Sequence, residues 1–205
     1  MGLMQIRHPL IEDVLATLRD RSTPSEDFRR LTRKLSTLLV FEASRDLPTR
    51  QVEVETPLER APAQRLDAEV VLVPVLRAGM GMLEAMLDIF PAASVGYVGL
   101  ERDEETAVAH RYYCKLPDLP ERFVFLLDPM LATGGSALAA VEALQEQGAR
   151  RIRLLCIVAA PEGVRLLEER CPEVDVFAAS VDRELDPRKY ILPGLGDFGD
   201  RLFGT

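Results

Sequence analysis

Short, uninterrupted apolar runs alternate with amphipathic segments from residue 69 onward. Because no face of these runs is polar, they are typical of strands buried on both sides: EVVLVPV (69–75), SVGYVG (94–99), RFVFLL (122–127), RIRLLCIVAA (151–160) and VDVFAAS (174–180). Several of these runs are separated by segments whose apolar residues recur at helical spacing, over 79–89, 135–147 and 162–170. This order predicts an α/β fold with a mostly parallel central sheet flanked by helices. Ligands of such sheets bind beyond the carboxyl ends of the strands, so a site is expected in the loops after residues 75, 99, 127, 160 and 180.

The segment 1–48 is expected to be an N-terminal helical region. Pro9 suits a first helical turn, and the apolar residues after it recur at helical spacing. Thr23 and Glu26 match a capping box, with Pro24 at the first position of a second helix.

Three further segments complete the outline of one domain over 1–205 with its core at 69–181. Alternation over 51–55 predicts a half-exposed strand. Residues 100–120 are polar and lack a strong period, which predicts a long loop. Residues 184–205 are rich in Gly and Pro and show no clear helix or strand.

Composition narrows the classes of protein that the chain can represent. Apolar residues make up 47% of the 205 positions, which is typical of a globular protein, and the formal net charge is −8. A surplus of acids disfavours a basic-patch binder of nucleic acid or of anionic membranes. Three cysteines without a C-x-x-C motif argue for a reducing compartment, and two histidines argue against a Cys/His zinc site. Since no apolar run approaches the length of a membrane span, a cytoplasmic protein is expected.

The most informative segment is FVFLLDPMLATGGSALAAV, residues 123–141. A buried strand delivers Asp128 at its carboxyl end, and a helix begins just after Thr133, Gly134, Gly135 and Ser136. Paired glycines, two hydroxyl groups and a helix N-terminus together favour a phosphate cradle. The absence of a lysine in a G-x-x-x-x-G-K-[ST] pattern excludes a Walker loop. An ordinary strand-to-helix turn with a glycine hinge is the simpler alternative.

This segment resembles the signature of the type I phosphoribosyltransferases, and its D-P-M-L-A-T-G-G-S form resembles their uracil branch. The resemblance extends to VPVLRAGMGM (73–82), GLERDEET (99–106), YYCKLP (112–117), VAAPEG (158–163) and YILPGLGDFGDRLFGT (190–205). It implies the type I phosphoribosyltransferase fold, with a flexible loop at 100–120 and a C-terminal hood at 184–205. It further implies transfer of the 5-phosphoribosyl group from phosphoribosyl diphosphate to N1 of uracil, giving UMP and diphosphate in pyrimidine salvage.

The resemblance also assigns residues to the phosphoribosyl diphosphate site: Arg77, Arg102, Asp128, Pro129, Met130, Leu131, Ala132, Thr133, Gly134, Gly135, Ser136 and Asp197. Within this set, Asp128 would hold the ribose hydroxyls, and Arg77 and Arg102 would receive the diphosphate. Each has a simpler alternative, because Arg77 can be a solvated residue at a strand end and Arg102 can belong to a solvated charged turn. Lys115 is a weaker candidate cation.

The C-terminal segment contains Gly194-Leu-Gly196-Asp-Phe-Gly199, a literal G-x-G-x-x-G. A dinucleotide-binding role is excluded, because that motif must follow a strand and open a long βαβ unit. By resemblance the segment reads uracil through Ile191, Gly196, Asp197 and Phe198; a coiled, flexible tail is the alternative. Asp197 is a second catalytic candidate, as a group that assists loss of the N1 proton, and deprotonation without an enzymic base is equally consistent. Glu101 and Phe198 depart from the family pattern, which expects an aromatic and a smaller residue there.

The expected metal is Mg²⁺ carried by the substrate, with no direct protein ligand, because Pro129 replaces the second acid of most relatives. A homodimer or higher even oligomer is expected, and GTP is a candidate allosteric effector. The rival functions are an RNA-binding regulator of pyrimidine genes that senses phosphoribosyl diphosphate or a nucleotide, and a non-catalytic nucleotide-binding module. The regulator would need a basic face, and this chain offers only scattered arginines. The presence of Asp128, Arg77, Arg102 and the hood residues argues against the non-catalytic module.

Overall fold

A computed structural model describes residues 2–102 and 109–205, and it leaves the side chains of residues 101, 102, 109 and 110 undescribed. Its main sheet runs in the order β1-β11-β10-β8-β4-β6-β7, with β5 added beside β4 and β9 beside β10. All pairs are parallel except β6–β7. The strands span Leu3–Gln5 (β1), Val70–Leu76 (β4), Ser94–Val95 (β5), Tyr97–Arg102 (β6), Ala109–Lys115 (β7), Phe123–Leu127 (β8), Met130–Leu131 (β9), Arg151–Ala159 (β10) and Asp175–Val181 (β11). The predicted parallel α/β core is confirmed.

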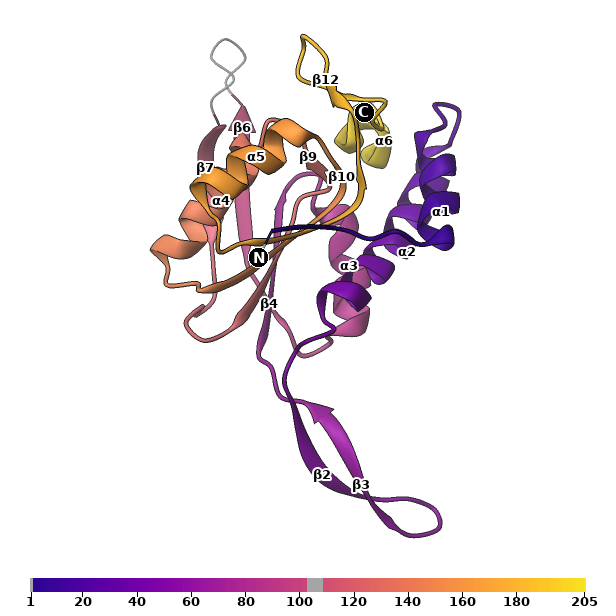
Figure 1. The fold of residues 1–205 in the computed structure, drawn as a ribbon, viewed down its shortest axis with the longest axis vertical. Coiled ribbons are helices and arrows are strands. Elements are labelled where there is room, and N and C mark those ends of the chain that lie inside the picture. The colour runs from indigo at the N-terminus through magenta and orange to yellow at the C-terminus, as the bar shows by residue number, and fades with distance from the viewer. Residues whose placement is uncertain (1, 103–108) are drawn as a thin grey trace.

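Helices cover both faces of this sheet (Figure 1). One layer holds α1 (Pro9–Arg19), α2 (Ser25–Ala43) and α3 (Met80–Ile89), and the other holds α4 (Gly135–Glu146) and α5 (Pro161–Arg170). Alternate residues of each central strand enter opposite cores: Leu72 and Phe125 pack with the first layer, whereas Val73 and Leu126 pack with the second. This two-sided burial explains why the strands appear in the sequence as unbroken apolar runs.

Two smaller sheets lie outside the main sheet. Strands β2 (Thr49–Glu55) and β3 (Arg60–Leu66) form an antiparallel hairpin that projects from the body as an arm (Figure 1). The C-terminal segment contains the paired strands β12 (Glu184–Leu185) and β13 (Ile191–Leu192), followed by α6 (Phe198–Phe203). The expectation that 184–205 lacks helix and strand is therefore wrong, because these elements are only two to six residues long and leave no periodic signal.

The expected loop at 100–120 is partly strand. Residues up to Arg102 continue β6, and Ala109–Lys115 return as β7 in an antiparallel ribbon. The ribbon lies at the edge of the sheet with residues 111–115 exposed, so it shows no alternation of apolar and polar positions. Residues 103–108 of the predicted flexible loop at 100–120 lie outside the described residues, and the flexibility of the loop stays a prediction.

The capping box predicted at Thr23 does not form. Helix α2 begins at Ser25, its cap residue Pro24 is extended, and no side chain caps it. The Thr23 hydroxyl instead donates to the Thr17 carbonyl at the end of α1, at 2.6 Å. Pro9 does open α1, and His8 supplies the cap, since its Nδ1 accepts from the Leu10 N–H at 3.1 Å.

No helix in the described part of the chain is both long enough and apolar enough to cross a membrane.

Candidate active site

The carboxyl ends of β4, β8, β10 and β11 lie at one edge of the sheet, where the C-terminal segment folds over them (Figure 1). A cavity of about 200 Å³ lies at this edge. Its walls come from three distant parts of the chain: Ala78 after β4, Met130 and Ala132 after β8, and residues 189–191 and 196–199 of the C-terminal segment. The structure therefore brings the predicted loops after residues 75 and 127 together with the predicted hood.

Asp128 follows β8 directly, and the residue is only 8% exposed. Burial raises the pKa of this carboxyl group to about 6, although a hydrogen bond from the Met130 backbone N–H acts in the opposite direction. Among the described residues, no cation contributes to the shift. An acid in such a place carries its charge at a cost, which a ligand offering hydroxyl donors or positive charge would offset.

The segment after Asp128 is held rigidly against β10. The Pro129 carbonyl accepts from the N–H groups of Ile157 and Val158, at 2.9 and 3.1 Å, and Met130–Leu131 pair with β10 as strand β9. The Leu131 side chain is buried, and its carbonyl accepts from the Ala160 N–H at 2.8 Å. Any contact that Leu131 makes with a ligand must therefore use its backbone.

Gly134 marks the start of the predicted phosphate cradle. It takes the left-handed conformation (φ 85°) as the cap residue of α4, a conformation that glycine adopts without steric cost. Thr133 Oγ1 accepts from the Gly135 N–H at 3.4 Å, and no side chain caps the helix. The first turn, with Ser136 half-buried on it, presents backbone N–H groups at the positive end of a 12-residue helix. This arrangement suits an anion.

Arg77 lies after β4, next to the cavity-lining Ala78, and its side chain is 64% exposed. Its guanidinium lies 4.0 Å from the Asp200 carboxylate and 5.9 Å from the centre of the Phe203 ring, so it contacts α6. The peptide bond between Leu76 and Arg77 is cis. This loop and the C-terminal helix thus form neighbouring walls of the site.

Gly79 allows this loop to lie close to the end of β8. A Cβ atom on Gly79 would lie 2.3 Å from the Leu127 carbonyl oxygen and 2.7 Å from the Val75 nitrogen, both backbone atoms. The loop that carries Arg77 therefore packs directly beside the residue that precedes Asp128.

Arg102 is placed only by its backbone. Arg102 pairs with Ala109 in the β6–β7 ribbon. It lies three residues after Gly99, and Gly99 pairs with Leu76 at the end of β4. The side chains of Glu101 and Arg102 lie outside the described residues, so their predicted contacts stay predictions. Lys115 pairs with Tyr97, five residues before Arg102, and five strand steps separate the two levels by about 16 Å.

The predicted base-reading residues lie together in the C-terminal segment. Ile191, Gly196, Asp197 and Phe198 all line the cavity. The Asp197 carboxylate also caps α6 by accepting from the Asp200 N–H at 2.9 Å. The Phe198 ring, however, is buried and contacts the Phe28 ring edge-on, with centroids 5.0 Å apart. Its large side chain therefore belongs to the core, and its backbone is the part left for a ligand.

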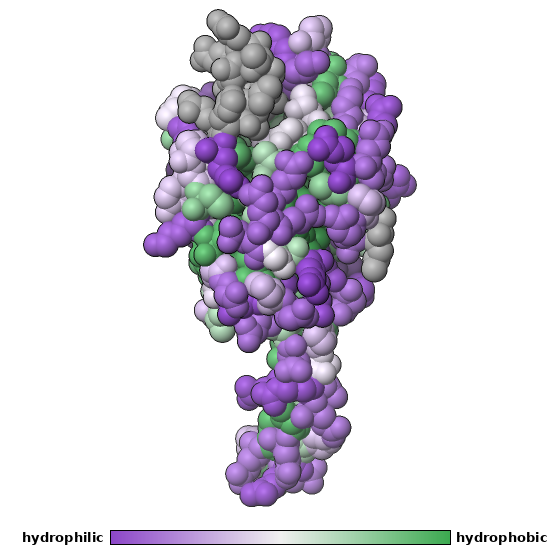
Figure 2. Space-filling model, turned by 90° about the vertical axis from the view of Figure 1, so that its left-hand side faces the viewer, coloured by the Kyte–Doolittle hydropathy of each residue, from purple (hydrophilic) through white to green (hydrophobic). Residues whose placement is uncertain are grey.

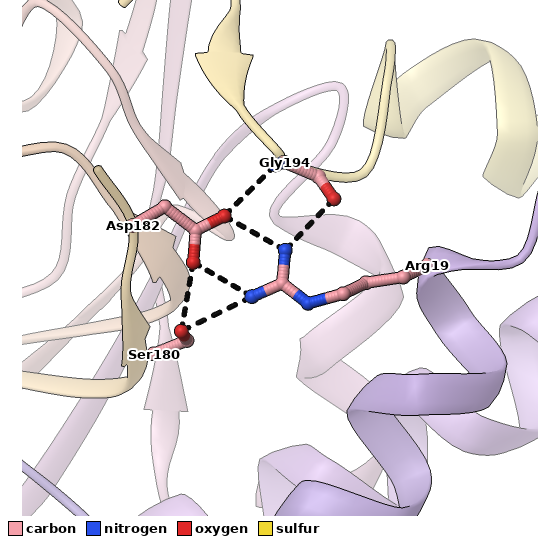
Figure 3. Close-up of polar contacts among 4 residues, drawn as sticks. All are labelled: Arg19, Ser180, Asp182 and Gly194. Carbon is pink, nitrogen blue, oxygen red and sulfur yellow. Dashed lines mark hydrogen bonds and ion pairs between the residues drawn. The ribbon is translucent and has the colours of Figure 1, made fainter. Parts of the chain in front are cut away.

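Several residues that hold the site together were not predicted from the sequence. Arg19 of α1 binds Asp182, Ser180 and the carbonyl of Gly194, across more than 160 positions of sequence (Figure 3). Arg201 of α6 binds the carbonyls of Leu18, Asp20 and Leu195 at 2.6 to 2.9 Å. The only signal in the sequence is that Asp182 follows the predicted strand end at residue 180.

Comparison with known proteins agrees with the motifs. The family model described as Uracil phosphoribosyltransferase matches residues 5–205. A Uracil phosphoribosyltransferase of Symbiobacterium thermophilum is 51% identical over 202 residues, covering 98% of this chain and 97% of that protein. A solved structure of an Aquifex aeolicus protein superimposes with a TM-score of 0.95 at 39% identity, covering 99% and 98% of the two chains. A hypoxanthine-guanine phosphoribosyltransferase from Bacillus anthracis shares the fold at a TM-score of 0.54 and 8% identity, covering 77% and 80% of the chains.

The pKa of Asp128 yields a test of stability against pH. Because the folded-state pKa of about 6 exceeds the usual aspartate pKa of 3.8, the folded protein bears a buried charge above pH 6 that the unfolded chain holds in water. This lowers the free energy of unfolding by about 3 kcal/mol at pH 7.5, and the loss disappears as the pH falls from 6 to 4. Asp128→Asn should therefore raise the free energy of unfolding by up to about 3 kcal/mol at pH 7.5 and leave it nearly unchanged at pH 4, as measured by urea unfolding. A variant less stable than the wild type at pH 7.5 would contradict the assignment.

The packing of Gly79 yields a second test. Gly79→Ala should lower the free energy of unfolding by about 1–3 kcal/mol, because the new methyl group meets backbone atoms that cannot move separately from β4 and β8. Gly81→Ala is the matched control, since its Cβ would meet side-chain atoms instead of backbone: the end of Leu202 at 2.7 and 3.0 Å and the Thr32 methyl group at 3.4 Å. Thermal unfolding of both variants measures the difference. An equal loss of stability in the two variants would refute the explanation that Gly79 is required by its close approach to backbone atoms.

Proposed function

The chain belongs to the uracil phosphoribosyltransferase family, and we propose how its residues share the work of that reaction. The enzyme transfers the 5-phosphoribosyl group from phosphoribosyl diphosphate to N1 of uracil, which gives UMP and diphosphate, a step of pyrimidine salvage. The observation that supports the division of roles best is the single cavity shared by the loop after Asp128, the loop of Arg77 and the hood. The relatives named above are uracil phosphoribosyltransferases, and nothing favours the RNA-binding alternative, so it is not carried further.

The ribose 5-phosphate end of the donor would bind from Asp128 to Ser136. Backbone N–H groups at the start of α4 would hold the 5′-phosphate, with the Thr133 and Ser136 hydroxyls beside them. Asp128 would accept hydrogen bonds from the ribose hydroxyls and offset positive charge that develops on the ring as the bond from C1′ to diphosphate breaks. The rigid backbone of Pro129, Met130, Leu131 and Ala132 would fix the distance between these two contacts.

The leaving diphosphate would lie on the other side of Asp128, near the loop after β4. Arg77 is exposed there, and its described contacts, with Asp200 at 4.0 Å and the Phe203 ring at 5.9 Å, are both long, so it is available for a charge-assisted bond to an anion. Arg102 would be a second donor, as the family resemblance implies.

The base would occupy the cavity under the hood. Uracil presents an acceptor, a donor and a second acceptor along one edge, and backbone groups of Ile191, Gly196 and Phe198 can match that edge without a charged side chain. Asp197 lines the same cavity and would contact both the base and the ribosyl donor. It is our candidate for assisting loss of the N1 proton, with deprotonation free of any enzymic base as the alternative.

Mg²⁺ is proposed to arrive with phosphoribosyl diphosphate. Asp128 is an oxygen donor of the type that this ion prefers, yet the described residues include no group of three or more acids, histidines or cysteines that could hold a metal. The residues present therefore fit an ion carried by the substrate. When bound, Mg²⁺ would neutralise charge on the departing diphosphate.

We also propose a cytoplasmic location and GTP as an allosteric effector, to which we assign no residue. The three cysteines are free thiols, which suits a reducing compartment.

The hairpin β2–β3 supports an even-numbered oligomer. Val52 and Ala63 are half-buried on the arm, Leu58 at its tip is 95% exposed, and apolar surface interrupts its hydrophilic side chains (Figure 2). An isolated two-stranded ribbon is only marginally stable in water, so contact with a second copy would stabilise the arm.

The reaction is tested by incubating the protein with phosphoribosyl diphosphate, Mg²⁺ and, in turn, uracil, hypoxanthine, adenine or orotate. We expect UMP from uracil and no nucleotide from the other bases. Asp128→Asn should lower kcat by about 10²-fold or more, because it removes the charge that stabilises the transition state. Asp27→Asn, an exposed carboxylate on α2, is the control and should leave kcat unchanged. Failure of the wild type to form UMP would exclude the function, and full activity of Asp128→Asn would exclude the role of Asp128.

The arm is tested by replacing residues 52–63 with Asn-Gly, which can close a two-residue turn between the paired Gln51 and Gln64. The shortened protein should keep its circular dichroism spectrum and elute as a monomer, whereas the full chain elutes as a dimer or larger even assembly. Light scattering coupled to size-exclusion chromatography measures both masses. Identical masses for the two proteins would contradict the proposal.

A further inference from the structure

We propose that Arg19 and Asp182 form a clamp that sets the position of the base-reading backbone, and thereby the affinity for uracil. Both are positioning residues, since neither lines the cavity under the hood. The inference rests on the proposed role of the hood in binding the base, and it assigns a task in substrate recognition to the N-terminal helix α1.

The clamp is centred on a carboxylate with four hydrogen bonds (Figure 3). Asp182 Oδ1 accepts from Arg19 Nη2 at 2.6 Å and from the Ser180 hydroxyl at 2.8 Å. Asp182 Oδ2 accepts from Arg19 Nη1 at 2.7 Å and from the Gly194 N–H at 2.8 Å. Four bonds occupy the lone-pair positions of both oxygens, so the carboxylate has one well-defined orientation.

Gly194 is held by both of its backbone groups. Its N–H donates to Asp182, and its carbonyl accepts from Arg19 Nη1 at 2.9 Å. Gly194 lies between the two stretches of the hood that line the cavity, three residues after Ile191 and two before Gly196. Fixing the peptide groups of Gly194 therefore fixes the direction in which the backbone enters the cavity on either side.

The clamp also ties the hood to the part of the site that holds the ribosyl donor. The Asp182 N–H donates to the carbonyl of Ala159 at 2.8 Å, and Ala159 pairs with Leu131 in the loop after Asp128. A short, continuous path of hydrogen bonds thus sets the distance between the base-reading backbone and the phosphate cradle. Transfer of the ribosyl group depends on this distance, because C1′ of the donor and N1 of uracil must be placed within bonding reach of each other.

The electrostatics suit a permanent support. The Asp182 side chain is 3% exposed and that of Arg19 is 25% exposed. Burial acts to raise the pKa of Asp182, but the hydrogen bonds from Arg19, Ser180 and Gly194 outweigh it and hold the pKa below its usual value. The pair therefore stays ionised at neutral pH. Removing one partner would leave the other charged and buried, which is costly.

A second arginine holds the hood at a different place. Arg201 binds carbonyls at the end of α1 and at Leu195, and its guanidinium covers the Phe28 ring at 4.5 Å. It makes no hydrogen bond to Gly194 among the described contacts. Loss of the Arg19 clamp should thus loosen the entry to the cavity while the C-terminal helix stays attached to the body.

The decisive variant is Arg19→Lys, which keeps the charge and loses the fork that binds both carboxylate oxygens and the Gly194 carbonyl. We expect the KM for uracil to rise at least tenfold, while the KM for phosphoribosyl diphosphate stays within twofold of the wild type. Arg153→Lys is the matched control. Arg153 pairs with Asp46 at 2.7 Å and binds the Ala43 carbonyl, yet it lies at the start of β10, at the opposite end of the strand from the site. It should lower stability and leave both KM values unchanged.

Ser180→Ala provides an independent test, because it removes two hydrogen bonds of the clamp, one to Asp182 and one from Arg19, while the ion pair between those two residues remains. We expect a smaller rise in the KM for uracil, again without a change for phosphoribosyl diphosphate. If Arg19→Lys fails to fold, Ser180→Ala alone decides. An unchanged KM for uracil in the folded variants, or a parallel rise of both KM values, would overturn the inference while wild-type UMP formation still upholds the proposed function.

Discussion

A carboxyl group buried at the end of the central strand is the constraint from which the rest of the site follows. Asp128 is delivered to the carboxyl edge of the sheet by β8 and is shielded from water, which raises its pKa to about 6. The sheet around it is closely packed on both faces, which keeps Asp128 in an apolar surrounding. The free protein therefore carries an unfavourable interaction at neutral pH, and we propose that hydrogen bonds from the substrate's ribose would offset it.

The remaining parts of the site are backbone held in place by side chains elsewhere. The cradle at Gly134 uses N–H groups at a helix start, and the hood offers peptide groups around Gly196. In the proposed arrangement, fixed dipoles and a few local cations would let a chain of net charge −8 bind a phosphate and a diphosphate, because they act at short range while the distant surface acids are screened. Charged pairs such as Arg19–Asp182 serve to orient that backbone.

The sequence predicts the core and the strand-to-helix turn after Asp128 well, and it predicts the short elements of the hood poorly, for physical reasons. Strands buried on both faces and the D-P-M-L-A-T-G-G-S segment leave local patterns, because the contacts that shape them lie within a few residues. The hood depends on contacts between residues more than 160 positions apart, such as Arg19 with Asp182, which no local period encodes. The predicted capping box does not form, because the Thr23 hydroxyl donates to the Thr17 carbonyl of α1. The Phe198 ring is buried because it packs against the Phe28 ring of α2. The side chain of Arg102 lies outside the described residues, so its role stays a prediction.

The central claim is that Asp128 is held in an environment that disfavours its charge until substrate arrives. The most direct measurement is a carboxyl ¹³C NMR titration of the ligand-free protein, with the Asp128 signal assigned by its loss in Asp128→Asn. A midpoint near pH 6 is the predicted result, reflecting burial of the carboxyl group with no cation among the described residues to offset it. A midpoint near pH 4, as for an aspartate in water, would contradict the account.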